Sequence, residues 1–265
     1  AQVKTALLLA GLHAQGTTSV IEPSQSRDHT ERMLSAAGVK VETQNGAVSL
    51  DGPVAPDPLN MRVPGDFSSV AFLIVAATLV EGSDLTIEDV GLNPTRTGLL
   101  DVLRAMGADI ETKVTSHEGG EPMGEIRVRS TVLTRVAPDP ARVPTLIDEI
   151  PILAIAATQA EGDTEIRGAA ELRVKETDRI TALVDGIAAI GGKAVAHPDG
   201  LTVTGPTPLV GAPVDSKGDH RMAMAFAVAG LIAEGNVRIS KWSCVDTSFP
   251  EFLDVLGRAQ GRIAP

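Results

Sequence analysis

Polar and charged residues recur at one position of four apolar helices that the sequence predicts. Counting back fourteen positions from the glycine that ends each helix gives four residues: Gln2, Ser68, Asp148 and Arg221. The start of a helix presents free backbone N–H groups and the positive end of its dipole. A cation there opposes the dipole, so Arg221 indicates a bound anion. For Ser68 the simpler interpretation is that its hydroxyl caps the helix.

A second set of helix starts also carries cations. These starts are Arg27-Asp28-His29, the segment from Asn93 to Gly98, and the segment from Arg173 to Arg179. The simpler interpretation of the last one is a solvated helix start in which Glu176 and Arg179 form an i,i+3 pair. Basic residues nevertheless recur at equivalent places in a chain with a formal net charge of −11. This gathering favours a multiply anionic ligand, because arginine binds phosphate and carboxylate groups through two parallel hydrogen bonds.

Two carboxylates, Asp148 and Glu176, are expected among these cations. Such a pair can serve as general base and general acid if burial and neighbouring charges separate their pKa values. His29 and His220 lack the spacing to other His or Cys residues that a metal site needs, so we expect no metal. The sequence also lacks a Walker loop, a Gly-x-Gly-x-x-Gly motif after a strand and a Gly-x-Ser-x-Gly motif. Their absence argues against nucleotide binding and serine hydrolysis.

The composition argues against several other classes of function. The acidic balance repels nucleic acid and anionic lipid, and aromatic residues, which stack on bases, make up only 2% of the 265 residues. The longest apolar runs, 70–80 and 222–233, are about half of the roughly 20 residues that a membrane helix needs. We therefore expect neither a nucleic-acid partner nor a membrane. A single cysteine, Cys244, excludes an internal disulfide and fits a cytoplasmic protein.

The elements that must position these residues follow a repeated order. Each unit has an apolar helix that ends in glycine, a short strand, an amphipathic helix that ends in a second glycine, and then paired strands. The first helix of each unit is apolar nearly all round, so we expect it to be enclosed, with the sheets outside. The glycines that set this register are Gly16, Gly82, Gly162 and Gly235 for the first helices, and Gly38, Gly107, Gly191 and Gly261 for the second ones.

A Pro-rich stretch from Pro53 to Pro64 lacks periodicity and is typical of a crossover between domains. We place the boundary near residue 62, so that 1–62 holds one unit and 63–265 holds three. The polar stretch from Thr112 to Pro122 is predicted to be a hairpin or surface loop without an assigned function. The chain opens at Ala1 and enters the first apolar helix without an initiator Met or a signal peptide, so we expect it to begin inside a structured unit.

Seven segments together resemble one known family, the 5-enolpyruvylshikimate-3-phosphate synthases, and in particular its bacterial glyphosate-tolerant branch. The resemblance implies an α/β fold of repeated βαβαββ units with buried helices and outer sheets, the inside-out α/β barrel of enolpyruvyl transferases, in two domains of which the first is incomplete. The segments span nearly the whole chain: QVKTALLLAGL at 2–12, IEPSQSRDHTERML at 21–34, NPTRTGLLDVLRAMGADI at 93–110, LIDEIPILAIAA at 146–157, ELRVKETDRI at 171–180, GDHRMAMAFAVAGL at 218–231 and DTSFPEF at 246–252.

The resemblance also implies a reaction of aromatic amino acid biosynthesis. The enolpyruvyl group of phosphoenolpyruvate would move to the 5-hydroxyl of shikimate 3-phosphate, with release of phosphate and without a cofactor. Asp148 would orient and deprotonate that hydroxyl, and Glu176 would help to protonate the methylene carbon. Arg179 and Arg221 would bind phosphoenolpyruvate. The residues implied for shikimate 3-phosphate are Ala1, Gln2, Arg27, Asp148 and Lys175.

Two features depart from the family pattern. The Lys/Ser-rich loop and the Gly-Asn-Ala-Gly-Thr-like segment of the family's amino-terminal part have no counterpart in this chain, and Thr247 stands where some members have Lys. We therefore expect this chain to lack the amino-terminal portion of the family and to be inactive without it. We expect that portion to be a separate, complementary polypeptide. Two alternatives stay open. One is a UDP-N-acetylglucosamine enolpyruvyl transferase, and the other is a non-catalytic repeat fragment whose charged helix starts only cap helices.

Overall fold

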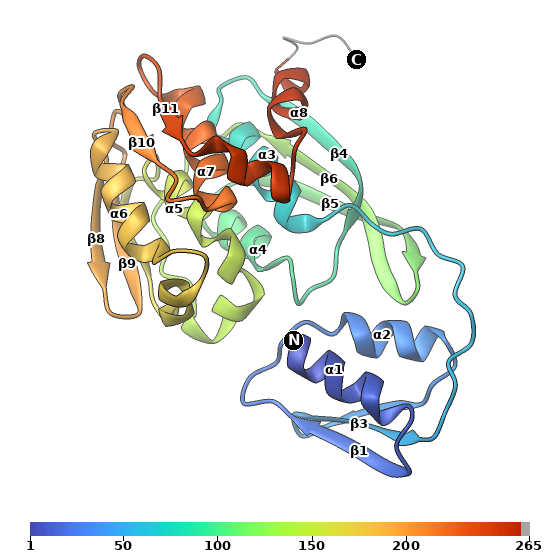
Figure 1. Cartoon of the computed structure of the whole chain (residues 1–265). Coiled ribbons are helices and arrows are strands. Elements are labelled where there is room, and N and C mark those ends of the chain that lie inside the picture. Colours follow the sequence, from blue (N-terminus) through green and yellow to red (C-terminus); the bar gives the residue numbers. More distant parts are fainter. Residues whose placement is uncertain (261–265) are drawn as a thin grey trace.

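The computed structural model describes residues 1–260, which form two lobes joined by one irregular segment (Figure 1). The amino-terminal lobe holds an antiparallel sheet in the order β1-β3-β2 with two helices on one face. Its elements are α1 (Gln2–Gly11), β1 (Gly16–Ile21), α2 (His29–Ala36), β2 (Val41–Gln44) and β3 (Ala47–Gly52). Leu8, Leu34 and Leu50 belong to the small hydrophobic cluster that holds the helices to the sheet.

Helix α1 is exposed along one side. Leu8 is fully buried, but Val3 is 75% exposed, and Leu7 and Leu9 are each 47% exposed. The prediction that the first helix of every unit is enclosed is therefore wrong for α1. The reason is that the sheet of its own lobe covers only one side of this helix.

The larger lobe contains three units, and the first two of these build sheets of the same topology, β4-β6-β5 and β7-β9-β8. The stretch 112–122 lies in the β5–β6 hairpin, as predicted. The second unit of the chain consists of α3 (Phe67–Leu79), β4 (Asp84–Gly91), α4 (Gly98–Ala105), β5 (Asp109–Glu118) and β6 (Glu121–Arg129). The third consists of the 3₁₀ turns η1 (Pro140–Thr145) and η2 (Ile147–Glu149), α5 (Ile150–Ala157), β7 (Gly162–Ile166), the 3₁₀ turn η3 (Ala170–Val174), α6 (Arg179–Ala189), β8 (Lys193–His197) and β9 (Gly200–Gly205).

The fourth unit replaces the closing hairpin with a helix. It consists of β10 (Pro213–Asp215), α7 (His220–Ile232), β11 (Arg238–Ser240), the 3₁₀ turn η4 (Trp242–Thr247) and α8 (Phe252–Ala259). Strand β10 pairs in parallel with β11, so a strand precedes the first helix of this unit. In the two units before it, the leading strand is reduced to single bridges, Gly65 to Val90 and Thr134 to Glu161. The predicted βαβαββ order is therefore present in the second and third units, with the leading strand reduced to a bridge, and it is shortened in the fourth unit; the amino-terminal lobe starts at α1.

Helices α3, α5 and α7 are enclosed at the centre of the larger lobe, and the sheets lie outside them (Figure 1). Every residue of α5 is buried, and so are Ile74 of α3 and Phe226 of α7. Helices that are apolar all round require this arrangement, because their whole surface must leave water. The starts of the three helices meet, since Glu149 before α5 contacts both Ser68 of α3 and Arg221 of α7.

The glycines that were predicted to end the first helices adopt the left-handed conformation, but they lie beyond the helix ends, because α1 ends at Gly11 and α5 at Ala157. At Gly16 and Gly162, for example, φ is +87° and +98°, a region that residues with a Cβ atom enter only at a cost. The other glycines with this conformation are Gly82, Gly235, Gly38, Gly107 and Gly191, whereas Gly261 lies outside the described residues.

The two lobes have separate hydrophobic clusters. Residues 54–64 between them form neither helix nor strand. The domain boundary near residue 62 stays a prediction, because no comparison tests it. Within residues 1–260, no helix is both long and apolar enough to cross a membrane.

Candidate anion-binding site

Four cations surround the carboxylate of Asp148. Arg27 Nη2 lies 2.5 Å from Oδ2, Arg179 Nη1 lies 3.6 Å from Oδ1, Lys175 Nζ lies 3.7 Å from Oδ1, and Arg221 Nη2 lies 3.8 Å from Oδ2. We call these five residues the Asp148 cluster. The structure thus brings together five of the residues that the sequence predicted for the site.

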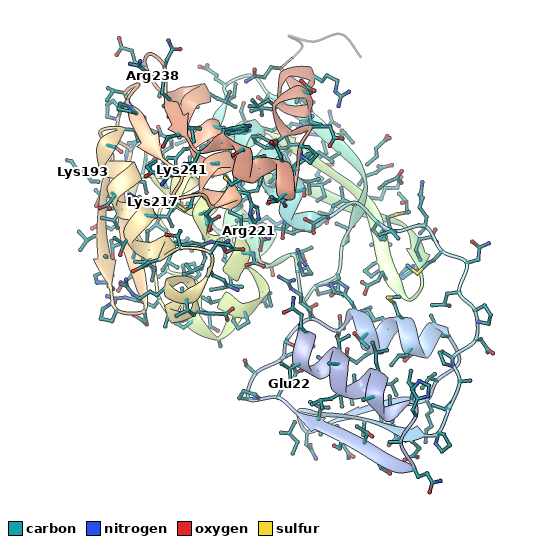
Figure 2. The ribbon with its side chains drawn as sticks, viewed as in Figure 1. Glu22, Lys193, Lys217, Arg221, Arg238 and Lys241 are labelled. Atoms are coloured by element: carbon teal, nitrogen blue, oxygen red, sulfur yellow. The ribbon has the colours of Figure 1, made fainter. Side chains whose placement is uncertain are left out.

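The Asp148 cluster is assembled from both lobes. Arg27 comes from the loop before α2, and Asp148 comes from η2, directly before α5. Lys175 follows η3, Arg179 is the first residue of α6, and Arg221 is the second residue of α7. Figure 2 shows Arg221 on the side of the larger lobe that faces the amino-terminal lobe, whereas Lys193 and Arg238 lie far from it. Arg27 is therefore the contribution of the amino-terminal lobe to the cluster.

Asp148 is ionised at neutral pH. Burial alone would raise the pKa of its carboxyl group, but the charges of Arg221, Lys175 and Arg27 outweigh this effect and lower the pKa to about 2. Asp148 contacts all four of these cations, which also have other carboxylate partners, such as Glu171 at 2.5 Å from Lys175. An anionic ligand that binds the same cations must compete with it.

Arg179 is held by two further carboxylates, those of Asp219 and Glu176. Its side chain is 1% exposed, its Nε donates to Asp219 Oδ2 at 2.7 Å, and its Nη2 donates to Glu176 Oε2 at 2.6 Å. The predicted pair of Glu176 and Arg179 is present, but the idea of a solvated helix start is wrong for Arg179, because Asp219 holds it in the interior. Arg179 Nη1 is buried and has no hydrogen-bond partner among the described residues. This donor lies 3.6 Å from Oδ1 of Asp148.

Ser68 does not cap its helix. The cap of α3 is Asp66, whose side chain accepts from the backbone N–H of Ser69. Ser68 Oγ instead donates to Oε1 of Glu149 at 2.5 Å, and Arg96 Nη2 donates to Ser68 Oγ at 2.5 Å. The capping interpretation of Ser68 is therefore wrong, because Asp66 occupies the cap position and the hydroxyl oxygen of Ser68 accepts from Arg96 instead.

Sequence reasoning missed Glu149. This residue is 3% exposed and lies between Asp148 and the fully buried Ile150. Burial raises the pKa of its carboxyl group, although Ser68, Arg221 and Arg96 act in the opposite direction. The signal that could have found it is a second acidic residue set directly before a wholly apolar helix, where a buried charge requires a partner.

A polar network joins the two lobes beside Arg27. Asp28 accepts from Asn93 Nδ2 at 2.7 Å and from Arg32 Nε at 2.9 Å, and His29 Nδ1 lies 2.7 Å from Glu121 Oε1. Burial would raise the pKa of Asp28, but its hydrogen bonds from Arg32 and Asn93 lower it overall. Because Asp28 follows Arg27 in the chain, this network holds Arg27 against the larger lobe. Sequence reasoning left the β5–β6 hairpin, and with it Glu121, without a function.

Ala1 and Gln2 are not joined to the Asp148 cluster by a hydrogen bond or ion pair. Both are exposed, and the start of α1 lies on the side of its lobe that faces the larger lobe (Figure 1). Thr247 donates its hydroxyl proton to the carbonyl oxygen of Cys244 at 2.7 Å, so it is engaged in ending η4. Within residues 1–260, no group of three or more His, Cys, Asp or Glu side chains is placed to hold a metal ion.

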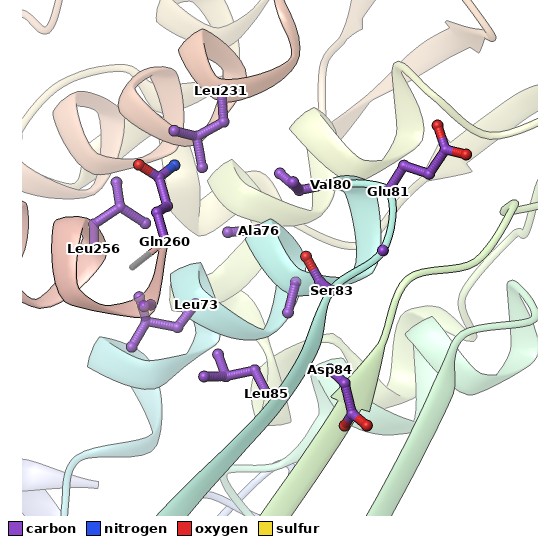
Figure 3. A pocket seen from close by; sticks show the side chains of 13 residues that line it. Leu73, Ala76, Val80, Glu81, Ser83, Asp84, Leu85, Leu231, Leu256 and Gln260 are labelled. Carbon is purple, nitrogen blue, oxygen red and sulfur yellow. The ribbon is translucent and has the colours of Figure 1, made fainter. Parts of the chain in front are cut away.

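A cavity of about 550 Å³ lies at the carboxyl-terminal ends of α3 and α7, away from the helix starts that carry the Asp148 cluster (Figure 3). Ala76 and Val80 of α3, Leu231 of α7 and Leu256 of α8 are part of its lining. No residue of the Asp148 cluster contributes to it. The chemistry of the site therefore lies at the starts of the buried helices and not in this cavity.

Comparison with known proteins places this chain in a family. The sequence profile of the family described as EPSP synthase (3-phosphoshikimate 1-carboxyvinyltransferase) matches residues 1–256. Proteins named 3-phosphoshikimate 1-carboxyvinyltransferase from Desulforamulus reducens and Geobacter sp. strain M21 are each 51% identical over 256 residues, which is 97% of this chain and 60% of each relative. The chain thus spans about 60% of the length of the curated relatives that it matches.

Solved structures agree with the sequence comparison. The EPSP synthase from Acinetobacter baumannii superimposes with a TM-score of 0.92 at 44% identity, over 98% of this chain and 60% of that one. The enolpyruvyl transferase NikO from Streptomyces tendae gives a TM-score of 0.74 at 20% identity, over 96% of this chain and 57% of that one, a likeness that shows the fold alone. The predicted fold class and the predicted family are thereby confirmed. By its sequence and its fold, this chain belongs to the EPSP synthase family.

Proposed function

We propose that this chain takes part in transfer of the enolpyruvyl group from phosphoenolpyruvate to the 5-hydroxyl of shikimate 3-phosphate, with release of phosphate. The observation that carries this proposal is the convergence of four cations from two lobes on the carboxylate of Asp148. Two substrates with phosphate and carboxylate groups need such a set of cations. The names of the relatives support the choice of substrates.

The proposed roles divide the Asp148 cluster between the two substrates. Arg179 and Arg221 bind phosphoenolpyruvate, and the Nη1 of Arg179, which has no hydrogen-bond partner among the described residues, supports this role. Shikimate 3-phosphate is bound by Arg27 and Lys175, together with Gln2 and the backbone of Ala1. Because Arg27 belongs to one lobe and Lys175 to the other, the cyclohexene ring of shikimate 3-phosphate lies between the lobes in this proposal.

Asp148 acts as the base in this proposal. In the ligand-free site its pKa is about 2, which makes it a weak base. When the substrates take up the charges of the surrounding cations, the pKa of Asp148 rises, and the carboxylate can accept the proton of the 5-hydroxyl. The hydroxyl oxygen then bonds to C2 of phosphoenolpyruvate.

The remaining steps restore the double bond. The methylene carbon C3 takes up a proton with the help of Glu176, which is half exposed and hydrogen-bonded to Arg179. This addition gives a tetrahedral intermediate. A proton then leaves C3, the bond between C2 and the phosphate oxygen breaks, and phosphate departs. Arg179 and Arg221 stabilise the charge that develops on the departing phosphate.

Phosphate release tests the reaction. The assay contains phosphoenolpyruvate and shikimate 3-phosphate and is run with the 265-residue chain and with a family-length protein that contains it. We expect release in the family-length protein only when both substrates are present. Release with UDP-N-acetylglucosamine and none with shikimate 3-phosphate would contradict the proposed substrate. The complementary polypeptide stays a prediction, which the mass of the purified material would test.

A further inference from the structure

Glu149 is a buried carboxylate for which the proposed mechanism has no use. It directly follows Asp148, and its Oε1 accepts a hydrogen bond from Ser68 and lies 3.7 Å from Nη1 of Arg221. Leaving a charge in such an enclosed position is costly unless it is paired. Its retention beside the Asp148 cluster therefore calls for a role in the geometry of the cluster.

With Glu149 ionised, each hydrogen bond around it has one possible direction. Arginine has no acceptor, so Ser68 Oγ must accept from Arg96 Nη2. The single hydroxyl proton of Ser68 is then free to go to Oε1 of Glu149. The chain of donors runs from Arg96 through Ser68 to Glu149, and it ties Glu149 at the start of α5 to the start of α3.

Arg221 lies between two carboxylates. Its Nη1 is 3.7 Å from Oε1 of Glu149, and its Nη2 is 3.8 Å from Oδ2 of Asp148. Its Nη1 also donates to the backbone carbonyl oxygen of Asp148 at 3.3 Å. If the charge of Glu149 were lost, Asp148 would be the remaining carboxylate beside Arg221. The guanidinium would then be drawn toward Asp148 and away from an incoming anion.

We propose that Glu149, held by Ser68 and Arg96, is a positioning residue that fixes the guanidinium of Arg221 for phosphoenolpyruvate. This inference rests on the proposed function. Glu149 touches no substrate in it and acts only through Arg221. The three buried helices are thereby joined at their starts, through Ser68 on α3, Glu149 before α5 and Arg221 on α7.

Glu149→Gln tests the role of the charge, because glutamine has the same size and its carbonyl oxygen can still accept from Ser68. In a family-length protein that contains this chain, we expect KM for phosphoenolpyruvate to rise about tenfold, as loss of one charge-assisted contact predicts. We expect kcat and KM for shikimate 3-phosphate to stay within about twofold, because Arg27 and Lys175 do not contact Glu149. Equal rises of both KM values, or no rise in either, overturn the proposal.

Ser68 offers a matched set of variants. Ser68→Ala removes the donor to Glu149 and should raise KM for phosphoenolpyruvate, whereas Ser68→Thr keeps the hydroxyl and should restore it. Ser69→Ala is the control, because the neighbouring hydroxyl contacts Asp66 instead. The double variant Ser68→Ala/Glu149→Gln should be no worse than Glu149→Gln alone. Additive effects, or a lower thermal midpoint without a selective effect on phosphoenolpyruvate, would mean a merely structural role.

Inorganic phosphate separates this proposal from the proposed function. Calorimetric titration of the 265-residue chain should show about tenfold weaker phosphate binding by Glu149→Gln than by the wild type. Unchanged phosphate affinity in the variant overturns the positioning role and leaves the proposed function standing. Weakened phosphate binding in a protein without turnover supports the positioning role and contradicts the function. A wild type that binds no phosphate contradicts both.

Discussion

At the scale of single residues, the chemistry depends on how Asp148 shares its charge. Four cations lie within 3.8 Å of its carboxylate oxygens, so the ligand-free site is closed by its own counterion. A substrate anion does not enter an empty positive pocket. In the proposed mechanism, it displaces Asp148 from its partners, and the displaced carboxylate becomes more basic.

Asp148→Asn should therefore separate binding from turnover. Without the charge of Asp148, the cations lose one competing anion, and we expect inorganic phosphate to bind about tenfold more tightly, as measured by calorimetry. Phosphate release from the two substrates should fall by at least about a hundredfold in a family-length protein, because the proposed base is lost. Tighter binding together with undiminished turnover would show that Asp148 is not the base.

The same substitution should change the dependence of stability on pH. The pKa of Asp148 is lowered from 3.8 to about 2 in the folded chain, so this residue stabilises the fold above pH 3.8 and loses that effect as the pH falls toward 2. At pH 7, Asp148→Asn should lower the free energy of unfolding by about 2 kcal/mol, and the difference should shrink between about pH 4 and pH 2. Urea titrations at several pH values measure it. Asp185→Asn, at an exposed position on α6, should show no such trend.

At the scale of elements, the site depends on how the buried helices begin. Helices α3 and α7 have the same kind of cap, an aspartate whose side chain accepts from backbone N–H groups of the first turn. The two caps differ in their surroundings. Asp66 is largely exposed, whereas Asp219 is completely buried and also holds Arg179. The same capping hydrogen bonds are therefore made by an exposed aspartate in α3 and by a buried one in α7.

The two caps should respond unequally to the same substitution. Asp66→Ala should destabilise the chain by about 1 kcal/mol, the usual loss for a helix cap. Asp219→Ala should cost about 3 to 5 kcal/mol, because it also leaves the buried guanidinium of Arg179 without its main partner. Chemical denaturation of both variants measures the contrast. Equal losses would mean that the pair of Asp219 and Arg179 contributes nothing beyond capping.

The sequence predicted the elements better than the contacts of the site. Left-handed glycines and runs of apolar residues are local signals, so the order of helices and strands could be read from them. Ser68 was misread because its partner, Glu149, lies 81 positions away, and no local pattern announces such a bond. Glu149 was missed because a second acidic residue beside Asp148 looks like part of a solvated helix start until its burial is known. The prediction that α1 is enclosed was wrong because an apolar composition indicates that a helix is buried but not which elements pack on each of its sides.

At the scale of the whole molecule, the two lobes meet through polar contacts and have separate cores. Asn93 is central to these contacts, since its Nδ2 donates to Asp28 at 2.7 Å and to Glu121 at 2.9 Å. It keeps two carboxylates from facing each other without a donor between them. The small core of the amino-terminal lobe makes this lobe the one that depends on the contact.

Asn93→Ala should loosen the amino-terminal lobe selectively. We expect amide hydrogen exchange in α2 to become about tenfold faster, because removal of a buried donor leaves two acceptors unsatisfied. Exchange in α5, deep in the larger lobe, should be unchanged. Asn236→Ala, at an exposed position, is the control. Equal acceleration in α2 and α5 would mean that the lobes unfold as one unit.

The placement of Arg27 on the smaller lobe also has an electrical consequence. The charged side chains of the larger lobe at the site have no excess of positive charge. The cations Arg96, Lys175, Arg179 and Arg221 are paired with the carboxylates of Asp66, Asp148, Glu149, Glu171, Glu176 and Asp219. Arg27 adds one positive charge from the amino-terminal lobe, in contact with Asp148. If the lobes moved apart, Arg27 would leave the site and take its positive charge with it. The affinity of the site for anions is therefore tied to the distance between the lobes.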